Sequence, residues 1–261
     1  MRPVPVLMYH HVNPHHGDTV TVTPEVFEAQ MDHLRESGYR TLTAVELLGY
    51  IKGELTLKQK AVVITFDDGW LDNYLYAFPV LKKNHLNATV FIITDRVEKA
   101  SGKMSSLPEY IPTHNESKVL IGKGEAHRVA LNWKLIEEVT AGGLVEFYSH
   151  TKSHRKCDTL SEHQLREELG ESKEIIEKRL GRACPFLCWP YGKYTRGAVQ
   201  AAREVGYGAL YTTDHGVVKA GSDPFAIKRI VVQDKREWFG KRMSLYTNPI
   251  LSFFSLALKK Q

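Results

Sequence analysis

The stretch Ala61-Val62-Val63-Ile64-Thr65-Phe66, followed directly by Asp67-Asp68-Gly69, decides the fold of this 261-residue chain. Its first six residues are apolar on both faces and rich in β-branched side chains, and the run is too short for a helix. Strands of this kind occur in parallel sheets that are covered on both faces. We therefore expect a buried strand over 61–66 that ends where two carboxylates begin.

Outward from this strand, strand-like and helix-like segments alternate along the chain. Apolar runs predict strands at 4–9, 88–93, 144–148, 186–189, 209–212 and 226–232. Capping patterns and helical spacing predict helices that begin near Thr23-Pro24, Thr43, Leu71, Trp133, Ser161 and Thr195. Repeated β-then-α units indicate an α/β fold with a parallel sheet, and the length and strand count favour a barrel. We expect one domain over 1–261, with its core at about 4–232 and a helical tail at about 235–261.

One segment, from about residue 98 to 130, breaks this alternation. It is polar, rich in Gly, Ser, Lys and His, and lacks clean periodicity. We expect it to be a long insertion over one rim of the sheet. Such segments are either substrate lids and binding loops or merely mobile, and the sequence leaves both interpretations open.

Composition narrows the classes of partner. Hydrophobic residues make up 43% of the chain and charged residues 25%, which is typical of a globular protein. The net charge is only +5 and the basic residues are scattered, so nucleic acid is not an expected partner. No apolar run approaches the ~20 residues of a membrane span. The N-terminal residues lack a small-residue cleavage site, which predicts a cytoplasmic protein without an export signal.

The C-terminal segment 249–260 is apolar and ends in two lysines. It is too short to cross a bilayer, but it could lie at the inner membrane face with its lysines toward anionic head groups. A terminal helix docked on the barrel explains the pattern equally well. The sequence leaves peripheral membrane contact and docking open.

Two adjacent carboxylates, Asp67 and Asp68, follow the buried strand. In parallel α/β folds the carboxyl ends of the strands hold the active site. Two carboxylates at such a point repel each other and resist burial unless a cation or a proton offsets their charge. A bound metal ion is the natural offset, and a solvent-facing turn is the alternative.

Two histidines, His150 and His154, follow the strand predicted at 144–148. Their spacing places both imidazoles on one face of a helical turn, from which they can reach one ion. Since this pair and the aspartate pair both follow strands, both project onto the same rim. Two imidazoles and one carboxylate, with open positions for water and substrate, are the ligands of a catalytic zinc or related divalent ion.

Together these motifs resemble a known family. Thr65-Phe66-Asp67-Asp68-Gly69, His150-x-x-x-His154 and Trp189-Pro190-Tyr191-Gly192 are similar to the motifs of the NodB-like polysaccharide deacetylases, carbohydrate esterase family 4. Val6-Leu7-Met8-Tyr9-His10-His11-Val12 resembles the subgroup with circularly permuted motif order, which includes deacetylases of poly-β-1,6-N-acetylglucosamine. The resemblance runs from about residue 4 to 232, and it implies a distorted (β/α)7-type barrel.

The resemblance also implies roles for individual residues. It makes Asp67 the general base and assigns the metal to Asp68, His150 and His154. The ion implied is divalent, with Zn²⁺ as the default and iron, cobalt or nickel as alternatives.

Two further roles follow from the resemblance. His10 matches the general acid of the permuted subgroup, with His11 as the alternative, and the backbone N–H of Tyr191 matches the donor that stabilises the oxyanion. The arginine that often begins the third motif is missing from the run ending in Trp189. Whatever orients the base must come from elsewhere, and Arg229 is one candidate.

The function expected from these residues is metal-dependent N-deacetylation of an N-acetylhexosamine in a bacterial polysaccharide or glycolipid. Amide hydrolysis needs an activated water, a stabilised oxyanion and a protonated leaving amine, and this set of residues supplies each. A deformylase or O-deacetylase acting on a lipid-linked sugar is the alternative within the same chemistry. A glycan-binding barrel without catalysis would not need a general base.

Overall fold

In the computed structural model, which describes residues 2–103 and 107–252, the decisive stretch forms strand β5 (Ala61–Phe66) with every residue buried. Strand β1 (Val4–Tyr9) is also buried throughout and lies parallel to β5, with Leu7 paired to Ile64. Both strands bury both of their faces, as the sequence predicts for strands enclosed by other elements.

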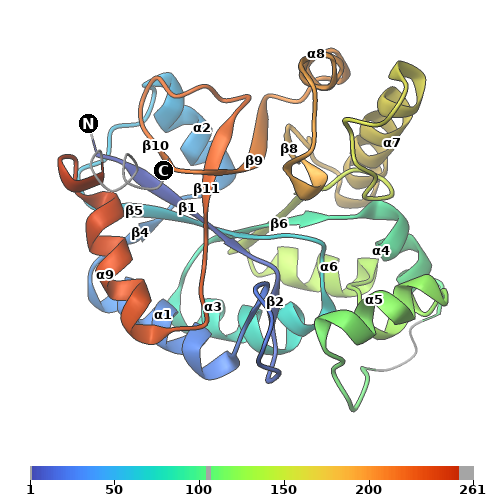
Figure 1. The fold of residues 1–261 in the computed structure, drawn as a ribbon, viewed down its shortest axis with the longest axis horizontal. Coiled ribbons are helices and arrows are strands. Elements are labelled where there is room, and N and C mark those ends of the chain that lie inside the picture. The colour runs from blue at the N-terminus through green and yellow to red at the C-terminus, as the bar shows by residue number, and fades with distance from the viewer. Residues whose placement is uncertain (1, 104–106, 253–261) are drawn as a thin grey trace.

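The sheet closes on itself into a barrel of parallel strands (Figure 1). Its order begins at β1 and returns to β1 through the pairing of β5 with β1. The remaining strands of the ring, in order from β1, are β11 (Ile227–Val231), β9 (Ala209–His215), β8 (Phe186–Cys188), β7 (Val145–Ser149) and β6 (Ala88–Ile92). With β1 and β5 they make the seven-stranded barrel that the sequence predicts. Short strands flank this ring or pair outside it: β2 (His11–Val12), β3 (Thr21–Val22), β4 (Arg40–Thr41) and β10 (Val217–Val218).

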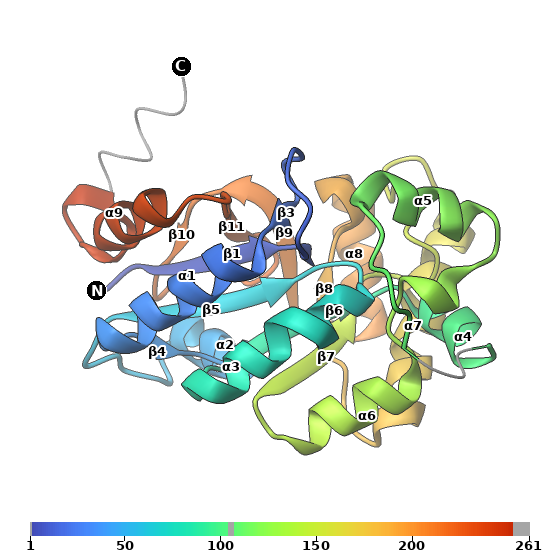
Figure 2. The ribbon, with the colours of Figure 1, turned by 90° about the horizontal axis from the view of Figure 1, so that it is seen from below.

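Helices surround the strands (Figure 2). They are α1 (Pro24–Glu36), α2 (Ala44–Lys52), α3 (Phe78–Asn84), α4 (Thr94–Ser101), α5 (His114–Gly122), α6 (Trp133–Ala141), α7 (Glu162–Leu180), α8 (Arg196–Val205) and α9 (Arg236–Thr247). One turn of π-helix, η1 (Asn73–Ala77), precedes α3, and short 3₁₀ turns lie at Ala126–Arg128 and Pro190–Gly192. The helices cover the apolar strands from outside, which completes the core.

Capping patterns place most helix starts correctly, with one difference. Thr43 and Ser161 form the reciprocal capping boxes predicted for α2 and α7. Thr23 precedes α1 as expected, but its hydroxyl does not cap the helix. It donates instead to the Asp234 carboxylate at 2.8 Å, which joins the start of α1 to the segment after β11.

The segment 98–130 is more regular than its polar sequence suggests. Glu98 lies in α4, and α5 begins with a capping box between Thr113 and Glu116. The end of the segment pairs with the chain after β5: the Leu131 N–H donates to the Gly69 carbonyl at 3.0 Å. The sequence predicts a long insertion here but no helix within it, and α5 escapes prediction because its amphipathicity is low.

The chain after the barrel forms α9, which packs against α1 and β1. The segment 249–260, for which membrane contact and docking both remain open, lies outside the described residues from 253 onward. Across the described ranges, no helix combines the length and the apolar character that crossing a membrane demands.

Candidate active site

Functional side chains from several strands meet at the carboxyl ends of the barrel strands. This is the rim where the loops of parallel barrels converge. The residues singled out from the sequence follow β1, β5, β7 and β8 or lie within β11: they are His10, Asp67, Asp68, His150, His154, Tyr191 and Arg229. The topology thus brings together residues that are more than 200 positions apart in the chain.

Asp67 is buried and is held by a bidentate ion pair with Arg229. The guanidinium donates to both carboxylate oxygens, at 2.8 and 2.7 Å. Burial alone raises the pKa of Asp67, but the guanidinium outweighs burial and lowers this pKa to about 2. The carboxylate is therefore ionised throughout the neutral range and has a fixed orientation.

Arg229 is fixed in turn by its neighbours in the barrel. Its Nε donates to the Thr212 carbonyl at 2.7 Å, and its Nη1 also reaches the Thr65 hydroxyl at 3.2 Å. The Cys188 sulfur lies 3.0 Å from the other terminal nitrogen, and burial keeps this thiol neutral by raising its pKa well above the usual value. The structure thus pairs Asp67 with the guanidinium of Arg229, the candidate named from the sequence, in place of the arginine missing from the third motif.

Asp68, His150 and His154 bring three ligand atoms within 4.8 Å of one another. The Nε2 atoms of His150 and His154 lie 3.7 and 3.2 Å from Asp68 Oδ1. Asp68 Oδ1 is buried and accepts no hydrogen bond. The Arg96 Nη1 lies 3.8 Å from it, too far for a hydrogen bond, so a bound metal ion would satisfy this oxygen.

The protonation of this group also suits a divalent metal. His150 Nδ1 lies 2.8 Å from the Cys188 carbonyl oxygen, which can only accept, so Nδ1 carries the proton and Nε2 keeps its lone pair. Burial lowers the pKa of His154 to about 3, which leaves its imidazole neutral. Although burial opposes it, the surrounding groups hold the pKa of Asp68 well below its usual value. One carboxylate and two imidazoles therefore face the same point, and they fit a Zn²⁺-type ion.

The backbone at this rim adopts uncommon conformations. Among the described residues, five other than glycine have positive φ, and four of them lie at the site: Asp68 (73°), Thr151 (65°), His154 (63°) and Tyr191 (58°). Positive φ is unfavourable for residues other than glycine, so these conformations persist only where the surrounding structure fixes them. This concentration of backbone strain marks the rim as a candidate site.

The two histidines reach the site from an irregular loop, so the expected helical turn is wrong. Thr151 and His154 both lie in the left-handed region, which no helical turn contains. Glu168 of α7 accepts from the Ser153 N–H at 2.9 Å, and the Glu168 carbonyl accepts from the Lys152 N–H. Because α7 satisfies the loop backbone, the loop needs no helical hydrogen bonds of its own.

His10 and His11 face different surroundings. His10 Nε2 lies 3.8 Å from Asp67 Oδ2, and the side chain is 23% exposed. His11 is 1% exposed, and its Nδ1 lies 2.6 Å from Asp72 Oδ2. His11 Nε2 lies 3.0 Å from Nδ1 of His114 in α5. His10 therefore borders the aspartate and the accessible rim, whereas His11 joins the barrel to the 98–130 segment.

Tyr191, from the motif 189–192, lies beside the candidate metal ligand His154. Its ring lies 4.5 Å from the His154 ring, between centroids, and its side chain is 57% exposed. The residue occupies the short turn after β8. It thus forms the exposed edge beside Asp68 and His150, which are buried, and His154, which is partly buried.

Comparison with known proteins agrees with this geometry. Residues 54–210, more than half of the chain, match the family model described as polysaccharide deacetylase. The chain belongs to this family. As a family member it carries the Asp-Asp and His-x-x-x-His pairs within the matched region, while His10 and Arg229 lie outside it.

Three relatives illustrate the similarity of this deacetylase-family chain to known proteins. It is 29% identical to the Bacillus subtilis protein YxkH, over 88% of this chain and 71% of that protein. It is 27% identical to the poly-β-1,6-N-acetyl-D-glucosamine N-deacetylase of Staphylococcus epidermidis, over 84% of this chain and 73% of that enzyme. The Escherichia coli enzyme of the same name is longer, and the chain spans 36% of its length.

The fold has a close counterpart among solved structures. The Streptococcus pyogenes deacetylase PplD, in complex with acetate, superposes with a TM-score of 0.79 at 23% identity, covering 95% of this chain and 99% of that one. At this identity the likeness establishes the fold alone. It confirms the barrel expected from the family resemblance.

Sequence reasoning missed one side chain of this deacetylase site. Trp70, two residues after Asp68, is buried and donates its indole N–H to Asp68 Oδ2 at 3.0 Å. The guanidinium of Arg96 lies over its ring, 5.1 Å from the centroid. The only signal available was its position beside the aspartates, since a tryptophan is also an ordinary core residue.

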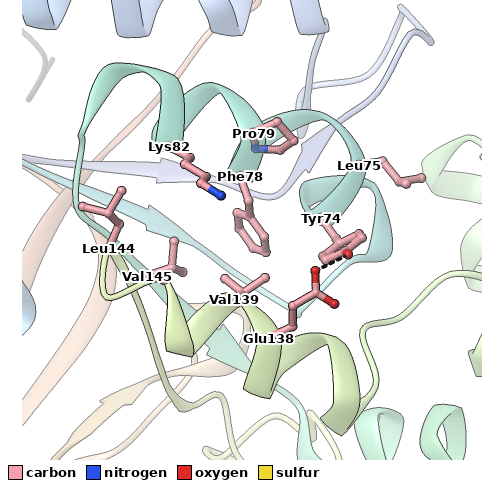
Figure 3. Close-up of a pocket in the computed structure, with 10 residues that line it drawn as sticks. Tyr74, Leu75, Phe78, Pro79, Lys82, Glu138, Val139, Leu144 and Val145 are labelled. Carbon is pink, nitrogen blue, oxygen red and sulfur yellow. Dashed lines mark hydrogen bonds between the residues drawn. The ribbon is translucent and has the colours of Figure 1, made fainter.

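The barrel also has a groove that lies away from the candidate active site. A groove of about 470 Å³ runs between η1, α3 and α6, over the start of β7. Figure 3 shows Phe78 and Val139 pointing into it, with the Tyr74 hydroxyl bonded to Glu138 at its edge. No residue of the candidate metal group lines this groove.

Proposed function

We propose that this chain is a divalent-metal-dependent N-deacetylase that hydrolyses the acetamide of an N-acetylhexosamine. One observation carries the proposal: Asp68 Oδ1, which accepts no hydrogen bond, lies together with His150 Nε2 and His154 Nε2 beside a separate, ionised Asp67. A purely structural cluster would not leave a buried carboxylate oxygen without a hydrogen-bond donor between two imidazoles and next to a second carboxylate.

Asp68, His150 and His154 would hold the metal. A bound Zn²⁺ or similar ion would polarise the acetamide carbonyl and acidify a water molecule. The residues themselves keep the correct protonation, because the Cys188 carbonyl fixes the His150 tautomer. Iron, cobalt and nickel suit the same donors.

Asp67 would serve as the general base that removes a proton from the attacking water. The bidentate contact with Arg229 uses one lone pair on each oxygen, and a carboxylate oxygen can accept more than one hydrogen bond. The guanidinium also keeps the carboxylate ionised despite its burial. Arg229 is thus a positioning residue for the base.

His10 would serve as the general acid that protonates the departing amine. Its Nε2 lies near Asp67 Oδ2 and its side chain stays partly exposed, so a substrate can reach it. Burial lowers the pKa of His10, and Asp67 opposes this only in part. A lowered pKa makes the imidazolium a stronger acid, although less of it is protonated at neutral pH.

Tyr191 would contribute its backbone N–H to the developing oxyanion. Its left-handed conformation turns the chain sharply after β8, next to His154. Fixed backbone donors are effective oxyanion ligands because they need no reorganisation during the reaction.

The substrate proposed is an N-acetylated polysaccharide or glycolipid of the poly-N-acetylglucosamine type, as the name of the staphylococcal relative suggests. An O-deacetylase or a deformylase acting on a lipid-linked sugar would use the same residues. We also treat residues 1–261 as one domain, since α9 packs on α1 and β1.

The test is direct incubation of metal-loaded protein with oligomers of β-1,6-N-acetylglucosamine and with N-acetylated, N-formylated and O-acetylated glycolipids. Mass spectrometry measures acetate or formate release and the matching mass loss. Release of acetate with formation of a free amine supports the proposal. Release only from O-acetyl or N-formyl substrates favours the alternatives, and no release from any of them contradicts the enzymatic proposal.

A further inference from the structure

Trp70 contacts the candidate metal ligand Asp68, although an indole cannot itself bind a metal ion. Its indole N–H donates to Asp68 Oδ2 at 3.0 Å, and the opposite oxygen, Oδ1, is the one that faces His150 and His154. An aspartate carboxylate rotates broadly about its terminal torsion and can present either oxygen. The indole contact selects which oxygen remains free.

The Trp70 ring is itself held in place from the barrel. The buried His11 ring stacks on it, with centroids 4.3 Å apart and planes 27° from parallel. Asp72 accepts from Asn13 at 2.9 Å and contacts His11 Nδ1, which fixes the His11 ring. The orientation of the indole is therefore determined by a chain of buried contacts.

Two further contacts fix Trp70 from the side of the insertion. Arg96 of α4 places its guanidinium over the indole. Trp70 also forms an isolated antiparallel bridge with Ala130, at the end of the 98–130 segment. These contacts leave the indole little freedom to turn away from Asp68.

We propose that Trp70 is a positioning residue for the metal: its indole N–H holds Asp68 so that Oδ1 faces the two imidazoles. This inference rests on the metal site of the proposed function. Removing such a supporting hydrogen bond typically weakens metal binding about 10–100-fold. The loss follows because the carboxylate must then be ordered by the metal alone and Oδ2 loses its buried donor.

The chain contains a matched control in Trp133. It is buried like Trp70, donates its indole N–H to a carboxylate (Glu98, at 2.7 Å) and has an arginine, Arg179, over its ring. Its hydrogen bonds and its cation–π contact join it to Ser101, Glu98 and Arg179, none of which belongs to the candidate metal group. A Trp→Phe substitution therefore makes the same chemical change at both positions, but only one position adjoins the metal.

The experiment compares Trp70→Phe and Trp133→Phe with the wild type, using Zn²⁺ affinity from competition with a chromophoric chelator and the visible spectrum of the Co²⁺ form. We expect Trp70→Phe to bind Zn²⁺ about 10–100-fold more weakly, with an altered Co²⁺ spectrum. Trp133→Phe should stay within about twofold of the wild type, because distant sites act independently. Equal affinities and spectra in Trp70→Phe and the wild type would overturn the inference.

A second measurement uses the wild type and covers the case in which Trp70→Phe does not fold. With ¹⁵N-labelled tryptophan, the indole signal of Trp70 should shift when Zn²⁺ is added, while the Trp133 signal stays in place. A static Trp70 signal during stoichiometric Zn²⁺ binding would contradict the positioning role. If the wild type binds no Zn²⁺, the proposed function fails, and that result is distinct from equal binding by the variants.

Discussion

The carboxyl-end rim of the barrel and the groove between α3 and α6 differ in nearly every property. At the rim, charged groups are buried, the His150 Nδ1 proton is fixed by a carbonyl oxygen, and residues such as Asp68 and His154 have positive φ. The groove is an open hollow of about 470 Å³ lined mainly by apolar side chains. In this protein, strained backbone and convergent polar atoms identify the candidate active site. The volume of a groove does not identify it.

Removing a metal ligand should have the largest effect. Asp68→Ala, His150→Ala and His154→Ala should each lose both bound metal and measurable deacetylation, because two ligands leave an incomplete site. Metal analysis of purified protein checks this, with His163→Ala, an exposed histidine, as the control. Stoichiometric metal in all three variants would show that these rim residues do not hold the metal.

Asp67→Asn should separate the base from the ligands. The amide cannot accept the proton, so the rate should fall about 10²–10⁴-fold while the metal stays bound. Steady-state kinetics and metal analysis on the same preparation measure both quantities. A variant that keeps more than about a tenth of the wild-type rate would show that another residue is the base.

Arg229→Met should destabilise the fold and change its pH dependence. Removing one partner of a buried ion pair costs about 3–5 kcal/mol. In the wild type the depressed pKa of Asp67 adds stability above about pH 4, which is lost as the pH falls toward about 2.

Without Arg229, burial raises the pKa of Asp67 above its usual value, so the variant should lose stability as the pH rises through that pKa. Urea unfolding between about pH 4 and pH 8 measures the effect. Arg166→Met, in an exposed ion pair, should cost far less than Arg229→Met and should show no such pH dependence. A pH-independent deficit in Arg229→Met would show that Asp67 does not sense the guanidinium.

His10→Ala should harm only substrates with poor leaving groups. We expect about a hundredfold slower release of acetate from the sugar amide, with most of the aryl acetate hydrolysis and all of the metal retained. His11→Ala should lower stability and leave the ratio of the two activities unchanged, because His11 contacts Asp72 and Trp70 and does not face the leaving group. The reverse pattern would move the acid to His11, and equal losses on both substrates would remove both residues from this role.

The smallest effect should come from the groove. Val139→Thr replaces a methyl group with a hydroxyl at nearly constant volume in the lining. We expect deacetylation to stay within about twofold of the wild type, with a melting temperature change of a few degrees at most. A large loss of activity with unchanged stability would show that the two regions are coupled.

The sequence predicts the barrel well because each of its strands is encoded locally. β5 has the bounds 61–66 predicted from an apolar run, and the adjacent aspartates mark its carboxyl end. Helix α5 was missed because its apolar face is weak, and only the capping box at Thr113 signals it. Local patterns therefore predict those elements whose buried residues form a clear apolar run or face.

The contacts within the site are less predictable because they depend on barrel closure. The meeting of Arg229 with Asp67 needs the register of β11, β1 and β5, which no local pattern contains. The partnership of Trp70 with Asp68 depends on a loop with positive φ at Asp68. The residue types could be selected from motifs, and Arg229 could be named as a candidate partner of Asp67, whereas the contact of Trp70 with Asp68 could not be predicted.

The barrel closes through β1, which pairs with β5 on one side and with β11 on the other. During synthesis Asp67 is made 162 residues before Arg229, so it leaves the ribosome long before Arg229 exists to neutralise it. Burying that carboxylate alone is costly, so the early strands should stay loosely assembled near Asp67 until the final strand arrives. We expect docking of β11 to be the step that commits the chain to its native state, and the same step completes the candidate active site.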